Sequence, residues 1–254
     1  MSEPTAPIGI IGGTGFGRIA ELGDAQSIDV ETEYGQPSCA LRLGELAGTG
    51  VAFLARHGSP HRIAPHRVNY RANIAALKSV GVREILAINA VGGIAAWARA
   101  GALAIPDQLI DYTHGRLSSF SDHGERAVEH IDFSDPFDAP LRARLLTAAN
   151  ASGVTVHDGG CVAVTEGPRL ETRAEIARLR RDGCDLVGMT SMPEAVLARE
   201  ASLAYASIAV IANPAAGVAE DVIGIHEIEL TLAATMQRVL QVIETFLMAT
   251  CRPR

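Results

Sequence analysis

Runs of apolar residues that end in glycine or polar residues recur along the chain. They cover residues 6–16, 50–58, 83–93, 184–194 and 205–217. Because these stretches are continuously apolar rather than alternating, they predict strands that are buried on both faces of a sheet. A sheet of this kind needs helices on both sides.

Helical segments are predicted between and after these strands. They cover residues 66–81, 138–153, 171–183 and 193–201, and a last amphipathic helix begins at about residue 225. Strands that alternate with helices predict an α/β fold with a mixed, largely parallel sheet. No linker, repeat or low-complexity block interrupts the pattern, so a single domain over residues 1–254 is expected. In such sheets ligands bind beyond the carboxyl ends of the strands, where the polar residues of this chain lie.

Composition narrows the class of protein. The chain is 48% hydrophobic with a mean hydropathy of +0.17, yet no apolar run approaches the roughly 20 residues of a membrane span. The N-terminus has no basic region followed by an apolar segment, which argues against a signal peptide. A net charge of −7 disfavours non-specific binding to nucleic acid. We therefore expect a cytoplasmic protein without nucleic-acid or membrane partners. Its cysteines form no CxxC pair and are expected to be reduced: Cys39, Cys161, Cys184 and Cys251.

A glycine-rich turn, Gly12–Gly17, follows the first predicted strand. A dinucleotide fingerprint that starts at Gly13 would need a glycine where Arg18 stands, and Lys78 is the only lysine, so no Walker loop exists. Backbone N–H groups and the hydroxyl of Thr14 remain, and such a turn can hold phosphate oxygens. The signal is weak, because many turns between a strand and a loop have this composition.

A second polar cluster, Arg56, His57, His61 and Arg62, follows the second predicted strand. The two histidines are four apart, but Gly58 and Pro60 would break the helix that could place them on one face, so a metal site is disfavoured. Arg56 and His57 are better anion ligands, because a guanidinium matches the fork of a phosphate. Surface charges on a loop are the alternative.

Two further positions can serve structure or function. Glu171 lies in the loop TEGPRLETRAE (Thr165–Glu175), where it could simply complement the dipole of the following helix. Asn213 ends the last predicted strand, where asparagine commonly caps or turns the chain, but its amide can also present a donor and an acceptor to a heterocycle.

The order of several motifs along the chain is more specific than any single position. The chain contains IGIIGGTGF, LARHG, VNYRANIAALK, INAVGG, TEGPRLETRAE and VGMTSMPE, and then the strand that ends at Asn213. This series covers most of the chain and resembles the trimeric purine nucleoside and methylthioadenosine phosphorylases. Enzymes of this family cleave the bond between purine and ribose with phosphate and release a sugar 1-phosphate. The resemblance implies one α/β domain around a mixed, barrel-like sheet, a homotrimer, and no metal or organic cofactor.

The resemblance also assigns roles to residues. Asn213, His57 and Arg56 would be catalytic, the ribose would lie against Met189, and His130, in HIDFSDPF, would reach the site of a neighbouring subunit. The implied phosphate ligands are Thr14, Arg56, His57, Asn89, Ala90 and Thr190.

Residues around the purine indicate which base is bound. The methylthioadenosine branch has an aspartate pair, D-x-D, where this chain has Asn213 and Ala215, and a serine where it has Glu171. Glu171 and Asn213 together resemble the branch that acts on 6-oxopurine nucleosides. A 6-oxopurine carries a proton on N1 that a carboxylate can accept, whereas N1 of adenine is an acceptor. A mispaired buried polar group costs about 1–3 kcal/mol, so hypoxanthine or guanine is expected.

The rest of the chain resembles the methylthioadenosine branch instead. The combination predicts phosphorolysis of S-methyl-5′-thioinosine to hypoxanthine and S-methyl-5-thioribose 1-phosphate. A general inosine and guanosine phosphorylase is the alternative, and methylthioadenosine phosphorolysis is less favoured. His226 could bind a 5′-hydroxyl or lie in the first turn of the last helix, whereas a methylthio group would need an apolar wall such as Ile225 or Val222. A binding protein without turnover, or a hydrolase, would lack dependence on phosphate.

Overall fold

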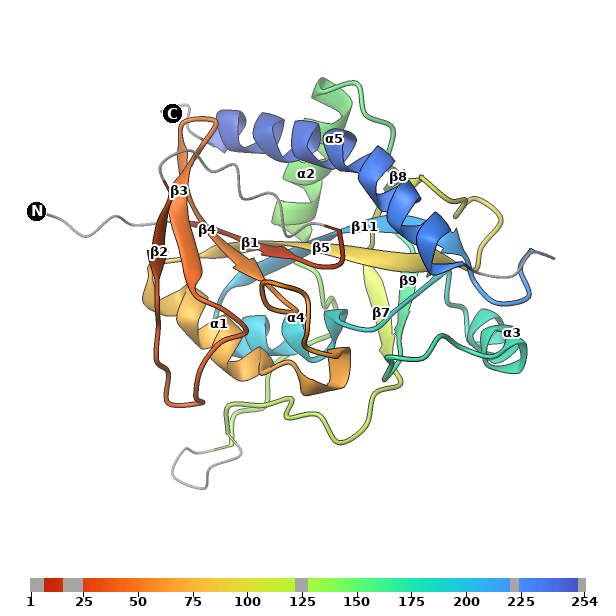
Figure 1. The fold of residues 1–254 in the computed structure, drawn as a ribbon, viewed down its shortest axis with the longest axis horizontal. Helices are drawn as coiled ribbons and strands as arrows, with labels where there is room; N and C mark the ends of the chain where they lie inside the picture. Colours follow the sequence, from red (N-terminus) through yellow and green to blue (C-terminus); the bar gives the residue numbers. More distant parts are fainter. Residues whose placement is uncertain (1–6, 16–24, 122–127, 220–223, 251–254) are drawn as a thin grey trace, which may run out of the picture.

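β5 (Glu84–Gly93) is the strand around which the sheet is organised. One edge pairs in parallel with β11 (Ala204–Pro214), and the other pairs first with β1 (Ile8–Gly12), in parallel, and then with β10 (Leu186–Gly188), antiparallel. The computed structural model describes residues 7–15, 25–121, 128–219 and 224–250. Among these residues the strands form one connected sheet, in which β5 is the branch point (Figure 1).

The main path of the sheet runs in the order β2-β3-β4-β1-β5-β10-β9-β7, and β11, β6 and β8 branch from it. The remaining strands are β2 (Gln26–Ile28), β3 (Leu41–Leu46), β4 (Thr49–Ala55), β6 (Leu103–Ile105), β7 (Gln108–Asp111), β8 (His157–Asp158) and β9 (Cys161–Val164). Parallel pairs outnumber antiparallel ones among the described strands. The predicted mixed, largely parallel sheet is confirmed.

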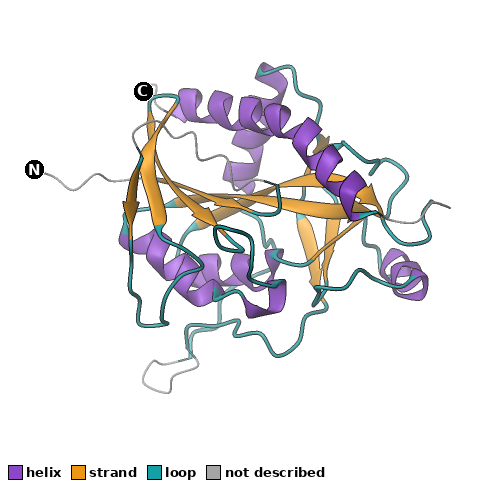
Figure 2. Cartoon of the chain, viewed as in Figure 1, coloured by secondary structure: helices purple, strands orange, loops and turns teal. Residues whose placement is uncertain are grey.

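Helices cover both faces of this sheet (Figures 1 and 2). α2 (Ala139–Ala151) and the long α5 (Ile225–Thr250) pack on one face, and α1 (Tyr70–Ser79) and α4 (Ser191–Glu200) on the other. α3 (Arg173–Arg181) lies at one end, and a short 3-10 turn, η1 (Pro65–Arg67), precedes α1. None of the described helices combines the length and apolarity that a membrane span needs.

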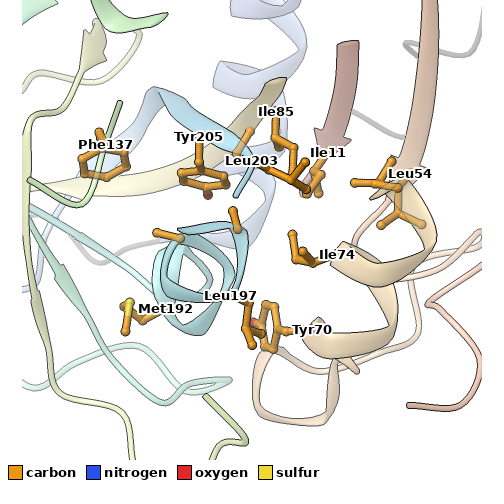
Figure 3. Close-up of a cluster of buried hydrophobic side chains, with 14 of the residues drawn as sticks. Ile11, Leu54, Tyr70, Ile74, Ile85, Phe137, Met192, Leu197, Leu203 and Tyr205 are labelled. Carbon is orange, nitrogen blue, oxygen red and sulfur yellow. The ribbon is translucent and has the colours of Figure 1, made fainter. Parts of the chain in front are cut away.

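Two large apolar clusters result from this layering, because successive residues of a strand point to opposite faces. In β1, Ile11 contributes to the cluster beneath α1 and α4, whereas Ile10 contributes to the cluster beneath α2 and α5. Figure 3 shows Ile11 in the first cluster with Ile74 of α1 and Leu197 of α4. Continuously apolar strands are thus explained by burial on both faces, as expected.

Most predicted segments extend beyond the elements that the structure shows, and two of them illustrate the difference. The predicted strand over 184–194 is only Leu186–Gly188, and α4 already begins at Ser191. The predicted helix over 66–81 begins at Tyr70, because the side chain of Asn69 caps it by accepting a hydrogen bond from the backbone N–H of Ala72.

Candidate active site

A cavity of about 350 Å³ is lined by residues at or just after the carboxyl-terminal parts of β1, β4, β5, β10 and β11. It brings together residues that are far apart in sequence, as expected where neighbouring strands of an α/β sheet end. Most of the residues singled out from the sequence line it: Thr14, Arg56, His57, Ala90, Glu171, Met189, Thr190, Asn213 and Ala215.

Three of the predicted site residues do not line the cavity. Asn89 is 3% exposed and lies behind Thr190. His226 is exposed in the first turn of α5, and His130 is exposed on the segment before α2. The role of His130 at a neighbouring subunit stays a prediction. Val222 lies outside the described residues.

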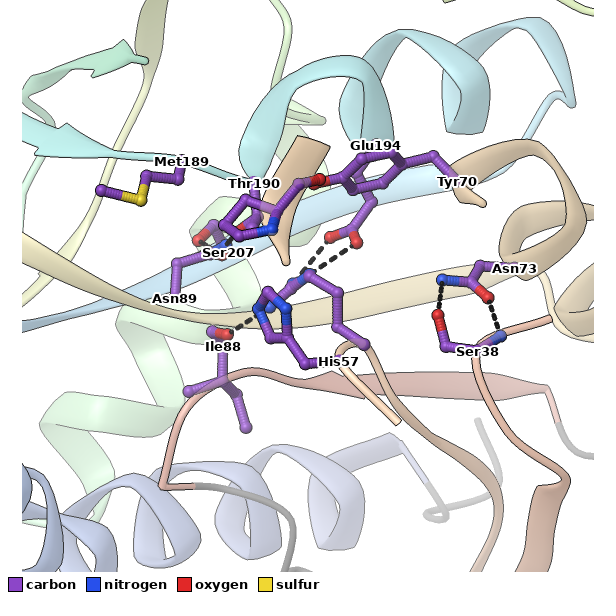
Figure 4. Close-up of polar contacts among 12 residues, drawn as sticks. Ser38, His57, Tyr70, Asn73, Ile88, Asn89, Met189, Thr190, Glu194 and Ser207 are labelled. Atoms are coloured by element: carbon purple, nitrogen blue, oxygen red, sulfur yellow. Dashed lines mark hydrogen bonds and ion pairs between the residues drawn. The ribbon is translucent and has the colours of Figure 1, made fainter. Parts of the chain in front are cut away.

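Arg56 is bound by a partner that the sequence analysis did not identify. Its Nε donates to Oε1 of Glu194 at 2.7 Å, its Nη2 donates to Oε2 at 2.8 Å, and its Nη1 donates to the carbonyl of Ile88 at 3.1 Å (Figure 4). One fork of the guanidinium is therefore occupied by a carboxylate, and binding of phosphate by Arg56 stays a prediction. Three of the five N–H groups of an arginine are used here, so two remain for the cavity.

The charges around Arg56 keep it ionised. Burial by itself would lower the pKa of Arg56, but the carboxylate of Glu194 outweighs it, and the pKa lies above its usual value. Glu194 also accepts a hydrogen bond of 2.8 Å from the hydroxyl of Tyr205. The carboxylate compensates the guanidinium, so this wall of the cavity carries little net charge.

Gly13 allows the chain to pass close to Arg56. A Cβ at this position would lie 2.8 Å from Nη1 of Arg56 and 2.9 Å from the carbonyl oxygen of Ile88. Any other residue would therefore displace the guanidinium or the strand. The glycine turn noticed in the sequence serves this approach, and Thr14 next to it lines the cavity.

His57 is a neutral ring in this environment. Burial, and then the charge of Arg56, lowers the pKa of His57 to about 4. Its Nδ1 lies 2.8 Å from the carbonyl oxygen of Ile63, and a carbonyl can only accept, so Nδ1 carries the proton. Nε2 is then a hydrogen-bond acceptor. The ring stacks on His61 with centroids 4.4 Å apart, and His61 also lines the cavity.

A buried chain of hydrogen bonds orients Thr190. The hydroxyl of Ser207 donates to Oδ1 of Asn89 at 2.7 Å, and Nδ2 of Asn89 donates to the hydroxyl oxygen of Thr190 at 2.8 Å (Figure 4). Because that oxygen already accepts a bond, the Thr190 hydroxyl proton is available to a ligand. Asn89 thus contributes through Thr190 rather than by lining the cavity.

The charge of Glu171 is not the one that complements the dipole of the following helix. α3 begins at Arg173, its cap is Thr172, and a capping box joins Thr172 to Glu175. The charge that complements the helix dipole therefore belongs to Glu175. Glu171 instead accepts a hydrogen bond of 2.6 Å at Oε1 from the hydroxyl of Thr165, the residue that follows β9.

A bulge in β11 directs Asn213 into the cavity. The register with β5 shifts between Ile211 and Asn213, so Ala212 is an extra residue in the strand. Neighbouring residues of a regular strand point to opposite faces, yet Ala212 and Asn213 both line the cavity. The amide nitrogen of Asn213 donates to the carbonyl of Pro214 at 2.7 Å, which leaves its second N–H and Oδ1 for a ligand.

Apolar side chains from α5 contribute to the cavity lining. Ile225 and Ile228 line it, whereas His226 between them does not. Ile225 is 63% exposed, and its role as an apolar wall for a ligand stays a prediction. Met189 adds a thioether to the lining.

Arg116 joins the loops that carry these residues. Its Nη1 donates to the carbonyls of Met189 and Met192 at 2.7 and 2.6 Å, and its Nη2 donates to the carbonyl of Glu166 at 2.8 Å. Its Nε pairs with the carboxylate of Glu166 at 3.2 Å, and the Arg116 side chain is 4% exposed. One guanidinium thus fixes the loop that follows β9 against the segment between β10 and α4.

Sequence reasoning did not identify Thr165, Glu194, Ser207 or Arg116 as part of this arrangement. Signals existed for two of them. Ser207 is a hydroxyl residue in the middle of an apolar strand and must find a buried partner, and an arginine directly after a buried strand needs a counter-ion such as Glu194. Arg116 lies in a segment without periodicity and gave no signal.

The described residues contain no group of three or more histidine, cysteine or acidic side chains placed to hold a metal ion. His57 and His61, which are four apart in sequence, stack on each other. The cavity lining therefore combines hydrogen-bond donors, a carboxylate, an amide and apolar side chains from α5.

Comparison with known proteins places this arrangement in context. The model of the phosphorylase superfamily matches residues 7–248. A Xanthomonas campestris protein named probable S-methyl-5′-thioinosine phosphorylase is 54% identical, over 85% of this chain and 87% of its own length. A probable 6-oxopurine nucleoside phosphorylase of Thermococcus kodakarensis is 45% identical, over 83% and 80%. The crystal structure of a methylthioadenosine phosphorylase from an Antarctic soil metagenomic library has a TM-score of 0.90 and 38% identity, over 99% of this chain and 89% of that chain. These matches confirm the family expected from the motifs.

Proposed function

The chain belongs to the phosphorylase superfamily, and from this we propose that it cleaves S-methyl-5′-thioinosine with phosphate, giving hypoxanthine and S-methyl-5-thioribose 1-phosphate. The 54% identity to a protein named for this activity supports the substrate. The choice among nucleosides rests on one observation. Glu171, Asn213 and apolar side chains of α5 line the same cavity.

Phosphate would bind at the end of the cavity formed by the glycine turn and the start of α4. Thr14, Thr190 and the two remaining N–H groups of Arg56 supply donors to its oxygens. The hydrogen phosphate dianion keeps one proton, and Nε2 of the neutral His57 can accept a hydrogen bond from this P–OH group. In this arrangement the dianion is held by directed hydrogen bonds rather than by excess positive charge.

The reaction follows from charge development along the glycosidic bond. As the bond breaks, positive charge grows on the sugar and negative charge on the purine. The bound dianion stabilises the first and then attacks the anomeric carbon. Glu171 would accept a hydrogen bond from the N1–H of hypoxanthine, and the free N–H of Asn213 would donate to N7. The proton of the hydrogen phosphate would pass to the departing purine, which leaves as neutral hypoxanthine. A fixed donor where charge develops lowers a barrier by about 3–4 kcal/mol.

The 5′ substituent would lie at the apolar wall. A methylthio group is apolar and polarisable, and Ile225 and Ile228 offer it contacts without a hydrogen-bonding demand. A 5′-hydroxyl in the same place would find no hydrogen-bond partner in these two side chains. His226, the candidate ligand for such a hydroxyl, does not line the cavity.

A general 6-oxopurine nucleoside phosphorylase is the second candidate. It is favoured by the 45% identity to the Thermococcus kodakarensis protein, and it would use the same Glu171 and Asn213. Methylthioadenosine would require the Glu171 carboxylate to face an acceptor nitrogen and is disfavoured.

We further propose a cytoplasmic homotrimer that needs no cofactor beyond phosphate. Exposed apolar side chains between β7 and α2, the part of the chain that contains His130, support association, because Leu117 is 56% and Val128 72% exposed on the single chain. Phosphate supplies the nucleophile itself, so no metal-activated water is required. Mass measurement in solution and assays after chelation would test these points.

The proposal is tested by base release from methylthioinosine, methylthioadenosine, inosine and adenosine, with and without phosphate. Phosphate-dependent preference for methylthioinosine supports it. Preference for inosine would favour the second candidate, and preference for methylthioadenosine would contradict the roles given to Glu171 and Asn213. Release that continues without phosphate would indicate a hydrolase.

A further inference from the structure

Glu171 stands between two cavities. One is the cavity described above, and the other, of about 430 Å³, opens on the far side of the loop that follows β9. Thr165 and Arg169 line the second cavity, and Glu171 lines both. A carboxylate in this position can turn towards either space, so its use in base recognition depends on what fixes it.

Thr165 supplies that restraint. Its hydroxyl lies 2.6 Å from Oε1 of Glu171 and 3.3 Å from the carbonyl of Gly188, so the proton is directed to the carboxylate. The distance to Oε1 is that of a charge-assisted O–H···O⁻ bond, which is stronger than a bond between neutral groups. One oxygen of Glu171 is thereby engaged, and Oε2 is left to face a ligand as an acceptor.

The backbone of Thr165 is itself rigid. Its N–H donates to the carbonyl of Gly188 at 2.8 Å, which extends the pairing of β9 with β10 by one residue. Its carbonyl accepts a bond of 3.2 Å from Nη2 of Arg116. The hydroxyl is therefore presented from the end of the sheet, whereas Glu171 lies in a loop six residues later.

The alternative partner of Glu171 on the far side is Arg169. That guanidinium is already bound to both oxygens of Glu175, at 2.9 and 2.7 Å. Without the Thr165 hydroxyl, Oε1 of Glu171 would lose the hydrogen bond that fixes it, and the carboxylate would be free to rotate. It would then no longer present a fixed acceptor to the base.

We infer that Thr165 is a specificity-determining residue of this site, which acts by fixing Glu171 as an acceptor for the N1 proton of a 6-oxopurine. The inference rests on the proposed function, because it assumes that Glu171 meets the base. Thr165 touches no reacting atom, so its role is to position another residue. A Glu171 carboxylate fixed by Thr165 favours 6-oxopurines over 6-amino purines. A carboxylate that is free to rotate loses this preference.

The test compares kcat/KM for methylthioinosine and methylthioadenosine at saturating phosphate. Thr165→Val keeps the shape of the side chain and removes the donor, and we expect the ratio of the two values to fall about tenfold or more. Thr165→Ser restores a hydroxyl and should recover most of the ratio. Thr155→Val, at an exposed position before β8, is the matched control and should leave it unchanged. Thr165→Ala replaces the valine variant if that variant does not fold.

A double-mutant cycle separates this role from a general structural one. In a Glu171→Gln background, Thr165→Val should change the ratio less than twofold, because the residue it positions has lost its charge. An unchanged ratio in Thr165→Val alone, or full additivity in the cycle, would overturn the inference. A wild-type enzyme that does not prefer the 6-oxopurine would instead refute the proposed function.

Discussion

Arg56 donates hydrogen bonds to both carboxylate oxygens of Glu194, and neither side chain is more than 1% exposed. The two residues are 138 positions apart and join the end of β4 to α4 across the floor of the cavity. A buried pair of this kind costs desolvation when it forms, but breaking it leaves a charge without compensation. The stability of the fold and the shape of the site are therefore linked at this point.

Glu194→Gln should lower the free energy of unfolding by about 3–5 kcal/mol, because Arg56 would remain buried without a counter-ion. Chemical denaturation monitored by circular dichroism measures the change. Asp158→Asn is the control: Asp158 pairs with Arg142 but is 66% exposed, and its replacement should cost less than about 1 kcal/mol. Equal losses of unfolding free energy in the two variants would show that the buried pair contributes no more to stability than the exposed pair.

The buried His57 should make stability depend on pH. Burial and the charge of Arg56 lower its pKa to about 4 from 6.5, so between these values the folded protein binds fewer protons than the unfolded chain. The stability that His57 contributes is thus complete above pH 6.5 and is lost as the pH falls towards 4, by up to about 3 kcal/mol.

This prediction is checked by comparing wild type with His57→Gln from pH 7 to pH 4. Burial lowers the pKa of His61 in the same direction, so only the difference between the two curves reports on His57. The variant should show a shallower decline. Parallel curves would mean that His57 keeps its ordinary titration in the folded protein.

Arg116→Lys should impair both folding and catalysis. A lysine has one ammonium group and cannot reach the carbonyls of Met189, Met192 and Glu166 together. We expect a loss of about 2–4 kcal/mol in stability, since several bonds to a charged group are removed, and a tenfold or greater fall in kcat/KM. Arg99→Lys, at an exposed position, is the control for the substitution itself. Full activity in Arg116→Lys would show that the two loops hold their positions without it.

The base assignment makes its own prediction. Glu171→Gln and Asn213→Ala should each reduce phosphorolysis of 6-oxopurine nucleosides by about tenfold or more. Asn213→Asp should move the preference towards 6-amino purines, with Glu171 limiting the gain. Steady-state rates on methylthioinosine and methylthioadenosine measure both effects. Unchanged 6-oxopurine rates in the first two variants would remove these residues from base recognition.

The long strands could be predicted from the sequence because they are apolar throughout and end in glycine or polar residues. Short strands such as Gln26–Ile28 and His157–Asp158 could not, since two or three exposed residues have no measurable periodicity. The ends of the long strands then indicated where the cavity would lie.

The hydrogen-bond partners of the site residues could not be predicted from the spacing of residues in the sequence. Nothing local links Arg56 to Glu194 or Ser207 to Asn89, because these pairs form only when distant strands meet. The proximity of Thr165 to Glu171 is more local, yet it depends on how the intervening loop folds. Motif resemblance found the residues that line the cavity, and the structure was needed to find the residues that hold them.

The extra residue in β11 has a consequence for how this pocket can change during evolution. Ala212 and Asn213 both line the cavity because β11 carries one residue more than β5 at this point, so the lining is set by chain length as well as by side-chain type. Deleting Ala212 would leave Asn213 opposite Gly92 but would remove one residue of the lining. A single-codon deletion, without any replacement of a polar residue, would therefore reshape the cavity beside Asn213.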